Sequence, residues 1–172
     1  MKLRVMWPAL ALFLAATFAL APFSTAAAQT VNPFQDIPVT GTIDTGGTFT
    51  GTLDITRFAV RQGQLVAIGT LTGTLTDALG NVIGTVTNVP VQLPVTGLSG
   101  TCEILDLELG PLDLDLLGLV VHLDRINLEI TAESGPGNLL GNLLCAIAGL
   151  LDNTPNTSGL ARLLNQLLRL FG

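Results

Sequence analysis

The chain is poor in the residues that carry most protein chemistry. Its 172 residues include no tyrosine, one histidine, two cysteines and one tryptophan, and charged residues make up 12% of it. Nucleophilic catalysis needs a base beside the nucleophile and a group that orients the base. The single histidine, His122, is set among valines and a leucine, and no serine lies in a G-x-S-x-G sequence. We therefore expect a protein that is not an enzyme.

Basic residues are also scarce. The formal net charge is −6, and the part after residue 28 keeps five arginines, no lysine and all thirteen acidic residues, which makes its net charge −8. Such a surface repels phosphate backbones. A nucleic-acid partner is therefore not expected.

The first 28 residues are typical of a secretory signal peptide. Lys2 and Arg4 precede an apolar run over 6–23, and the three alanines at 26–28 supply small residues ahead of a cut near Ala28. Two prolines interrupt the run, which favours a signal peptide over a membrane anchor. No later run reaches the roughly 20 apolar residues that a membrane span needs. We expect export to the periplasm or beyond, and one mature domain over 29–172.

Both cysteines, Cys102 and Cys145, follow this segment. Exported proteins with two cysteines usually join them. A disulfide would close a loop of about 44 residues and stabilise the fold by about 4 kcal/mol in the chain-entropy model. The alternatives are two buried free thiols or, more remotely, a metal site with the one histidine. We expect the disulfide, and no metal or other cofactor.

Alternating apolar and polar residues predict strands across the middle of the chain. The stretch 105–109 alternates leucines with acids, and 112–116 and 126–131 repeat the pattern. A period of two gives strands with one buried and one hydrated face. Upstream, the Thr/Gly-rich segments 47–54 and 69–76 agree at six of eight positions, and threonine favours pleated surfaces.

Turn residues divide this β region, which we place at 39–132, into seven to nine strands. Turns are expected at 61–64, 77–81 and 94–100. Short turns favour an antiparallel sheet, arranged as a sandwich or an open barrel.

The Gly110-Pro111 step has two interpretations. As a hairpin turn it would place Asp106 opposite Asp115 and Glu108 opposite Asp113, and facing like charges destabilise a sheet. A shared Ca²⁺ could neutralise them. Alternatively, the step is a corner that separates the two strands. No D-x-D-x-D-G loop is present, so the corner is favoured, with the acids on a hydrated face.

After Gly135 the pattern becomes helical, and we expect a helical hairpin over 138–172. In the first helix, small residues recur every four positions and include Cys145. This stripe permits close packing and places the predicted disulfide at the contact between helix and sheet. The second helix, capped by Thr157 or Ser158, has leucines at i, i+3 and i+4 spacing. Its opposite, polar side holds Arg162, Asn165, Gln166 and Arg169.

The predicted fold is therefore mainly β (α+β): a single antiparallel β-sandwich or open barrel of seven to nine strands, with two C-terminal helices packed on it. Two segments, 110–121 (GPLDLDLLGLVV) and 135–149 (GPGNLLGNLLCAIAG), resemble a family of exported bacterial proteins of unknown function. The resemblance implies a bacterial origin and a functional signal peptide. It implies no activity, ligand or catalytic residue.

Three functions are compatible with these observations. We expect a non-enzymatic structural or interaction domain of the bacterial envelope or extracellular space, which acts through contact with a protein or envelope partner. The alternative is a carrier that holds an apolar, lipid-like ligand between the sheet and the helices. A third is a membrane-surface protein that uses the terminal helix, although net negative charge opposes binding to anionic lipid.

Overall fold

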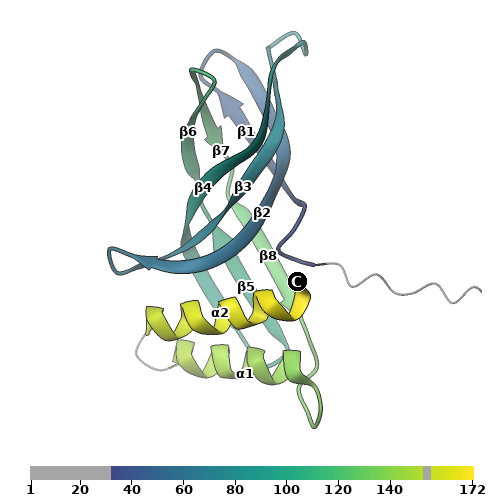
Figure 1. Ribbon diagram of the computed structural model, residues 1–172, viewed down its shortest axis with the longest axis vertical. Coiled ribbons are helices and arrows are strands. Elements are labelled where there is room, and N and C mark those ends of the chain that lie inside the picture. Colours follow the sequence, from purple (N-terminus) through teal and green to yellow (C-terminus); the bar gives the residue numbers. More distant parts are fainter. Residues whose placement is uncertain (1–31, 153–155) are drawn as a thin grey trace, which may run out of the picture.

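Eight strands and two helices form in the part of the chain that the structure describes, residues 32–152 and 156–172 of a computed structural model (Figure 1). The predicted signal peptide lies outside the described residues. The elements are β1 (Ile37–Ile43), β2 (Gly47–Arg61), β3 (Gln64–Thr76), β4 (Val82–Gly100), β5 (Ile104–Leu109), β6 (Leu112–Leu116), β7 (Leu119–Leu123), β8 (Ile126–Thr131), α1 (Leu139–Asp152) and α2 (Thr157–Phe171).

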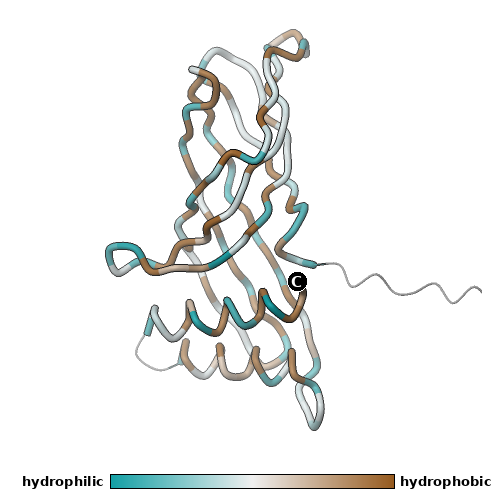
Figure 2. Tube along the Cα trace, viewed as in Figure 1, coloured by the Kyte–Doolittle hydropathy of each residue, from teal (hydrophilic) through white to brown (hydrophobic). Residues whose placement is uncertain are grey.

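The strands form one antiparallel sheet in the order β6-β7-β1-β2-β3-β4-β5-β8. The sheet curls into a half-barrel (Figure 1), and the colours of its strands alternate along much of their length (Figure 2). In β5 the leucines are buried and the acids between them face outward, as the alternation predicts. The predicted mainly β fold with two C-terminal helices is thus confirmed, as an open half-barrel.

β4 is longer than expected, and the turn predicted at 94–100 is wrong. The strand pairs with β3 as far as Pro94 and with β5 from Val95 onward, so that it changes partners without ending. Pro94 stands at the changeover. Proline has no N–H to donate to a ladder, so this is a position where a long strand tolerates it.

The step at Gly110-Pro111 is a corner. β5 lies between β4 and β8, whereas β6 pairs with β7 at the other end of the strand order. Asp115 therefore lies opposite Val120 rather than opposite Asp106. The facing acids are instead Asp106 and Glu129 in the β5–β8 pair.

The two similar segments pair with each other in β2 and β3. Gly51 lies directly opposite Gly73, and a Cβ added at either glycine would come within 3 Å of the ring of Phe49, which is fully buried. The glycine pair makes room for this aromatic ring on the inner face. The repeated Gly-Thr pattern thus serves the packing of the core.

The helices cover the lower part of the half-barrel in Figure 1. Leu160, Leu164 and Leu167 of α2 are buried against β2 and β3, so the terminal helix packs on the protein itself, as predicted. Its N-cap is Asn156, whose side chain accepts the N–H of Gly159. The cap is therefore one residue before Thr157, the first of the two predicted caps. Neither helix, nor any other in the described residues, is long and apolar enough to cross a membrane.

One residue predicted on the polar side of α2 faces the sheet instead. Beyond Leu53, β2 has no partner residue in β1. There the Asn165 side chain forms hydrogen bonds with the β2 backbone that a neighbouring strand would otherwise form. Its Oδ1 accepts the N–H of Phe58 and its Nδ2 donates to the C=O of Phe58, both at 2.8 Å. Asn165 therefore pairs with the backbone of β2.

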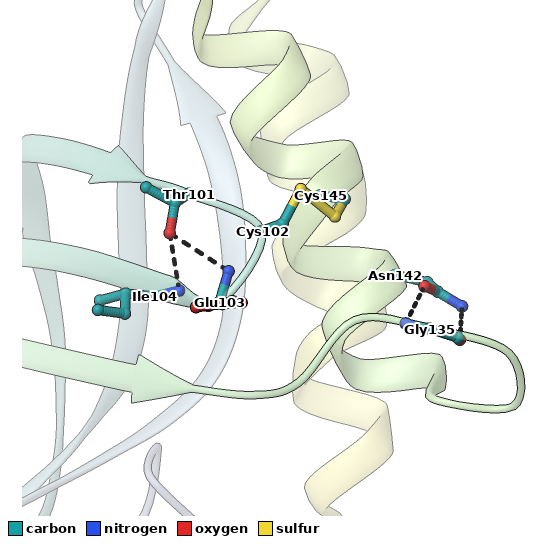
Figure 3. The surroundings of a disulfide bond; sticks show 7 residues. All are labelled: Thr101, Cys102, Glu103, Ile104, Gly135, Asn142 and Cys145. Atoms are coloured by element: carbon teal, nitrogen blue, oxygen red, sulfur yellow. Dashed lines mark hydrogen bonds between the residues drawn. A yellow bond between two sulfur atoms is a disulfide. The ribbon is translucent and has the colours of Figure 1, made fainter.

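The two cysteines lie at disulfide-bonding distance, the pairing that the sequence predicts (Figure 3). Cys102 is in the turn between β4 and β5, and Cys145 is in the middle of α1. One turn earlier in α1, Gly141 is buried, and a Cβ there would overlap the backbone at Glu133. Gly141 thus lets α1 approach the chain segment that follows β8.

Candidate functional site

The only histidine sits between two carboxylates on the outer face of the half-barrel. His122 in β7 is paired with Asp113 of β6, and Asp44 follows the end of the neighbouring β1. The His122 Nδ1 lies 2.6 Å from an Asp113 oxygen, and its Nε2 lies 2.6 Å from an Asp44 oxygen. These hydrogen bonds, first to Asp113 and then to Asp44, raise the pKa of His122 above its ordinary value.

This cluster fits a brace between strands better than a catalytic base. A neutral imidazole has one N–H, so only the protonated ring satisfies both carboxylates. The protonated ring has no free nitrogen that could take a proton from a nucleophile. The exposed serines Ser99, Ser134 and Ser158 are not among the hydrogen-bond partners of His122.

The cluster is also poorly arranged for a metal ion. The two carboxylates lie against opposite nitrogens of the ring, so they do not converge on one point. Across residues 32–152 and 156–172, no three His, Cys, Asp or Glu side chains are grouped in a way that could hold a metal. Of the two acids of β5, Glu108 forms an ion pair with Arg125 at 2.7 Å, and Asp106 lies opposite Glu129 of β8.

A second candidate is the groove between the two helices, on the side turned away from the sheet. The groove has a volume of about 560 Å³. We call it the helix groove; its lining residues are Leu139, Asn142, Leu143 and Ala146 of α1, and Leu163, Gln166, Arg169 and Leu170 of α2.

The helix groove is apolar and carries one charge. Arg169 is its only charged lining residue, and it forms no ion pair within the described part of the chain. Leu139 is 65% exposed and Leu170 is 43% exposed, although both are large hydrophobic residues. The groove is open and apolar, and the guanidinium of Arg169 flanks it. Such a surface complements a partner that has an apolar group next to a negatively charged one.

The place that the sequence suggests for an apolar ligand, between sheet and helices, is filled by side chains. Leu144 and Ile147 of α1 and Leu164 and Leu167 of α2 are completely buried. They belong to the same core as the leucines of the half-barrel. The candidate surface therefore lies on the outer side of the helices and not beneath them.

Sequence reasoning found the cysteine pair but missed both candidate sites. Asp44 and His122 are separated by 78 positions, and only the β1–β7 pairing brings them together. The helix groove had a detectable signal. The leucines of α2 cover a wider stripe of the helix surface than packing against the sheet alone requires. Leu163 and Leu170, two turns apart on the edge of that stripe, line the groove.

No protein-family model, curated protein or solved structure matches this chain.

Proposed function

We propose that this protein is an exported, non-enzymatic interaction domain of the bacterial envelope or extracellular space, and that it binds a polypeptide partner in the helix groove. The observation that carries the proposal is the groove itself, which is apolar along both helices and is flanked by Arg169, a residue without an ion pair in the part of the chain that the structure describes. The chemistry points to a partner that presents exposed apolar side chains beside a carboxylate.

The rigidity of the scaffold supports this function. α2 is fixed to the half-barrel by buried leucines and by Asn165, and α1 is tied to the β4–β5 turn by Cys102 and Cys145. A groove between two fixed helices loses little conformational entropy when a partner binds. Export is supported by the sequence of residues 1–28 and by the cysteine pair.

The carrier function draws less support. Ligand sites usually enclose most of the surface of a small molecule, whereas the helix groove lies open on the outside of the helices. The interior between sheet and helices, where a lipid could be enclosed, is occupied by Leu144, Ile147, Leu164 and Leu167.

A photo-crosslinking residue placed in the groove tests the proposal. Gln166 lines the groove, whereas Arg162 on the same helix is exposed outside it. Benzoylphenylalanine at position 166, in protein secreted by its native host, is expected to yield an adduct to a polypeptide. The same group at position 162 serves as the matched control. An adduct to lipid at position 166, or equal yields at both positions, would contradict the proposal.

A further inference from the structure

We propose that the partner in the helix groove is a second copy of this chain, which inserts the opposite end of its half-barrel, so that the protein assembles head to tail. This inference rests on the proposed function and specifies its partner. It follows from the chemistry of the two ends of the molecule.

The inserting surface, which we call the hairpin knob, consists of Leu79, Val82 and Leu117. Leu79 lies in the β3–β4 turn, Val82 is the first residue of β4, and Leu117 lies in the β6–β7 turn. Both turns are at the end of the half-barrel farthest from the helices (Figure 1), where hydrophobic residues reach the turn tips (Figure 2). Leu79 is 87% exposed, Leu117 is 67% and Val82 is 64%. Leu139, in the helix groove, is the only other large hydrophobic residue of the described chain that is more than half exposed.

Local contacts fix the conformation of the two turns of the knob in the unbound protein. Asp77 accepts the N–H of Leu79, and Asp115 accepts the N–H of Gly118, both at 2.9 Å. Leu117 reaches across to β4, because a Cβ added at Gly84 would lie 2.8 Å from its Cδ1. A surface that is already ordered binds at a lower entropic cost.

The charges of the two surfaces are opposite. Each protruding leucine of the knob stands two positions after an aspartate, Asp77 before Leu79 and Asp115 before Leu117, and neither turn contains a lysine or arginine. Hydrogen bonds from Asn81 lower the pKa of Asp77, which therefore stays ionised. Among the described residues, the lining of the groove includes no acid and one cation, Arg169, which forms no ion pair with them. The knob thus presents apolar side chains with carboxylates next to them. This is the chemistry that complements an apolar groove with one arginine.

Because the two surfaces differ and lie at opposite ends of the molecule, the contact is heterologous. Each copy keeps a free knob at one end and a free groove at the other, so that assembly continues as a chain or closes as a ring. Both surfaces are small, which indicates weak association, with dissociation constants of about 10 µM to 1 mM.

Two variants that each disable one end test the proposal by analytical ultracentrifugation. The knob variant is Leu79→Asp with Leu117→Asp, and the groove variant is Leu139→Asp with Arg169→Glu. All four positions are exposed, so both variants are expected to fold. The matched control is Arg162→Glu, which changes the charge of α2 outside the groove. Circular dichroism and thermal unfolding verify that each variant folds.

The wild type and the Arg162→Glu control are expected to increase in mean mass with concentration over about 10 µM to 1 mM. Each disabled variant alone is expected to remain a monomer. Their equimolar mixture is expected to form dimers and nothing larger, because only one knob and one groove remain per pair. Self-association of either variant alone, or no dimer in the mixture, would overturn the inference.

The same samples separate this inference from the proposed function. If the wild type stays monomeric while position 166 crosslinks to a different protein, the proposed function stands and the head-to-tail inference fails. If the monomeric wild type instead floats with phosphatidylcholine vesicles and the knob variant does not, the knob is a lipid-binding surface and the inference also fails.

Discussion

At the scale of single residues, His122 links three strands through one ring. It pairs with Thr42 of β1 and Asp113 of β6 in the sheet, and its side chain contacts Asp113 and Asp44. Both contacts need the protonated imidazole. The brace between β1, β6 and β7 is therefore sensitive to pH.

The first prediction concerns this pH dependence. Because folding raises the pKa of His122, its contribution to stability is complete below the unfolded value of 6.5 and is lost as pH rises through the folded value. The melting temperature of the wild type is expected to fall across that range. His122→Gln should lack this decline, and Asp113→Asn should reduce it. Parallel curves for the wild type and His122→Gln would contradict the brace.

A second prediction concerns Asn165, which satisfies the N–H and C=O of Phe58 where β2 has no neighbouring strand. Asn165→Ala leaves both backbone groups without this partner and is expected to lower the free energy of unfolding by about 1–3 kcal/mol. The control is Gln166→Ala, at the next position on α2 but exposed, which should change it by less than about 0.5 kcal/mol. Urea denaturation measures both, and equal effects would refute the pairing.

At the scale of elements, both helices pack on the half-barrel, and α1 has the cysteine pair as an additional link. α2 is buried through its leucines against β2 and β3. α1 contacts α2, β4 and β5, buries Leu144 and Ile147, and carries Cys145, which lies at disulfide-bonding distance from Cys102. The contribution of the cysteine pair can therefore be measured on α1, and that of the buried leucines on α2.

For α1, the third prediction is that native protein contains no titratable thiol and that Cys102→Ser with Cys145→Ser lowers the free energy of unfolding by about 2–4 kcal/mol. Hydrogen exchange is expected to accelerate most in α1 and in the β4–β5 turn, because the link joins these two elements. Two reactive thiols in freshly isolated native protein would refute the link.

For α2, the fourth prediction is that Leu164→Asp lowers the melting temperature by several degrees or more, because Leu164 is completely buried and a carboxylate there loses its water. Leu170→Asp is the matched control on the same helix, at a position that is 43% exposed, and its effect should be small. Tight vesicle binding by the wild type, with Leu164→Asp as stable as the wild type, would indicate that α2 binds lipid instead.

Local patterns were enough to predict most elements. The alternation in 105–109 and the leucine spacing in α2 depend only on residues close in sequence. The continuation of β4 past Pro94 could not be predicted, because it depends on β5 replacing β3 as its partner. The His122 cluster and the Asn165 contact were missed for the same reason. Each joins residues that only the sheet order and helix docking bring together.

At the scale of the whole molecule, the two ends differ in shape and charge. One end presents the hairpin knob with its aspartates, and the other presents the helix groove with Arg169. The half-barrel between them is fixed by a continuous core that includes leucines of both sheet and helices. The β scaffold holds these two surfaces at opposite ends of the molecule.

Native mass spectrometry of the protein isolated from its own host tests the proposed export, disulfide bond and polypeptide binding in a single measurement. We predict a chain that begins near Gln29, is lighter than its reduced form by two hydrogen atoms, and is found in part bound to a second copy or another protein, without lipid. A stoichiometric complex of a single chain with a lipid would show instead that the protein is a lipid carrier.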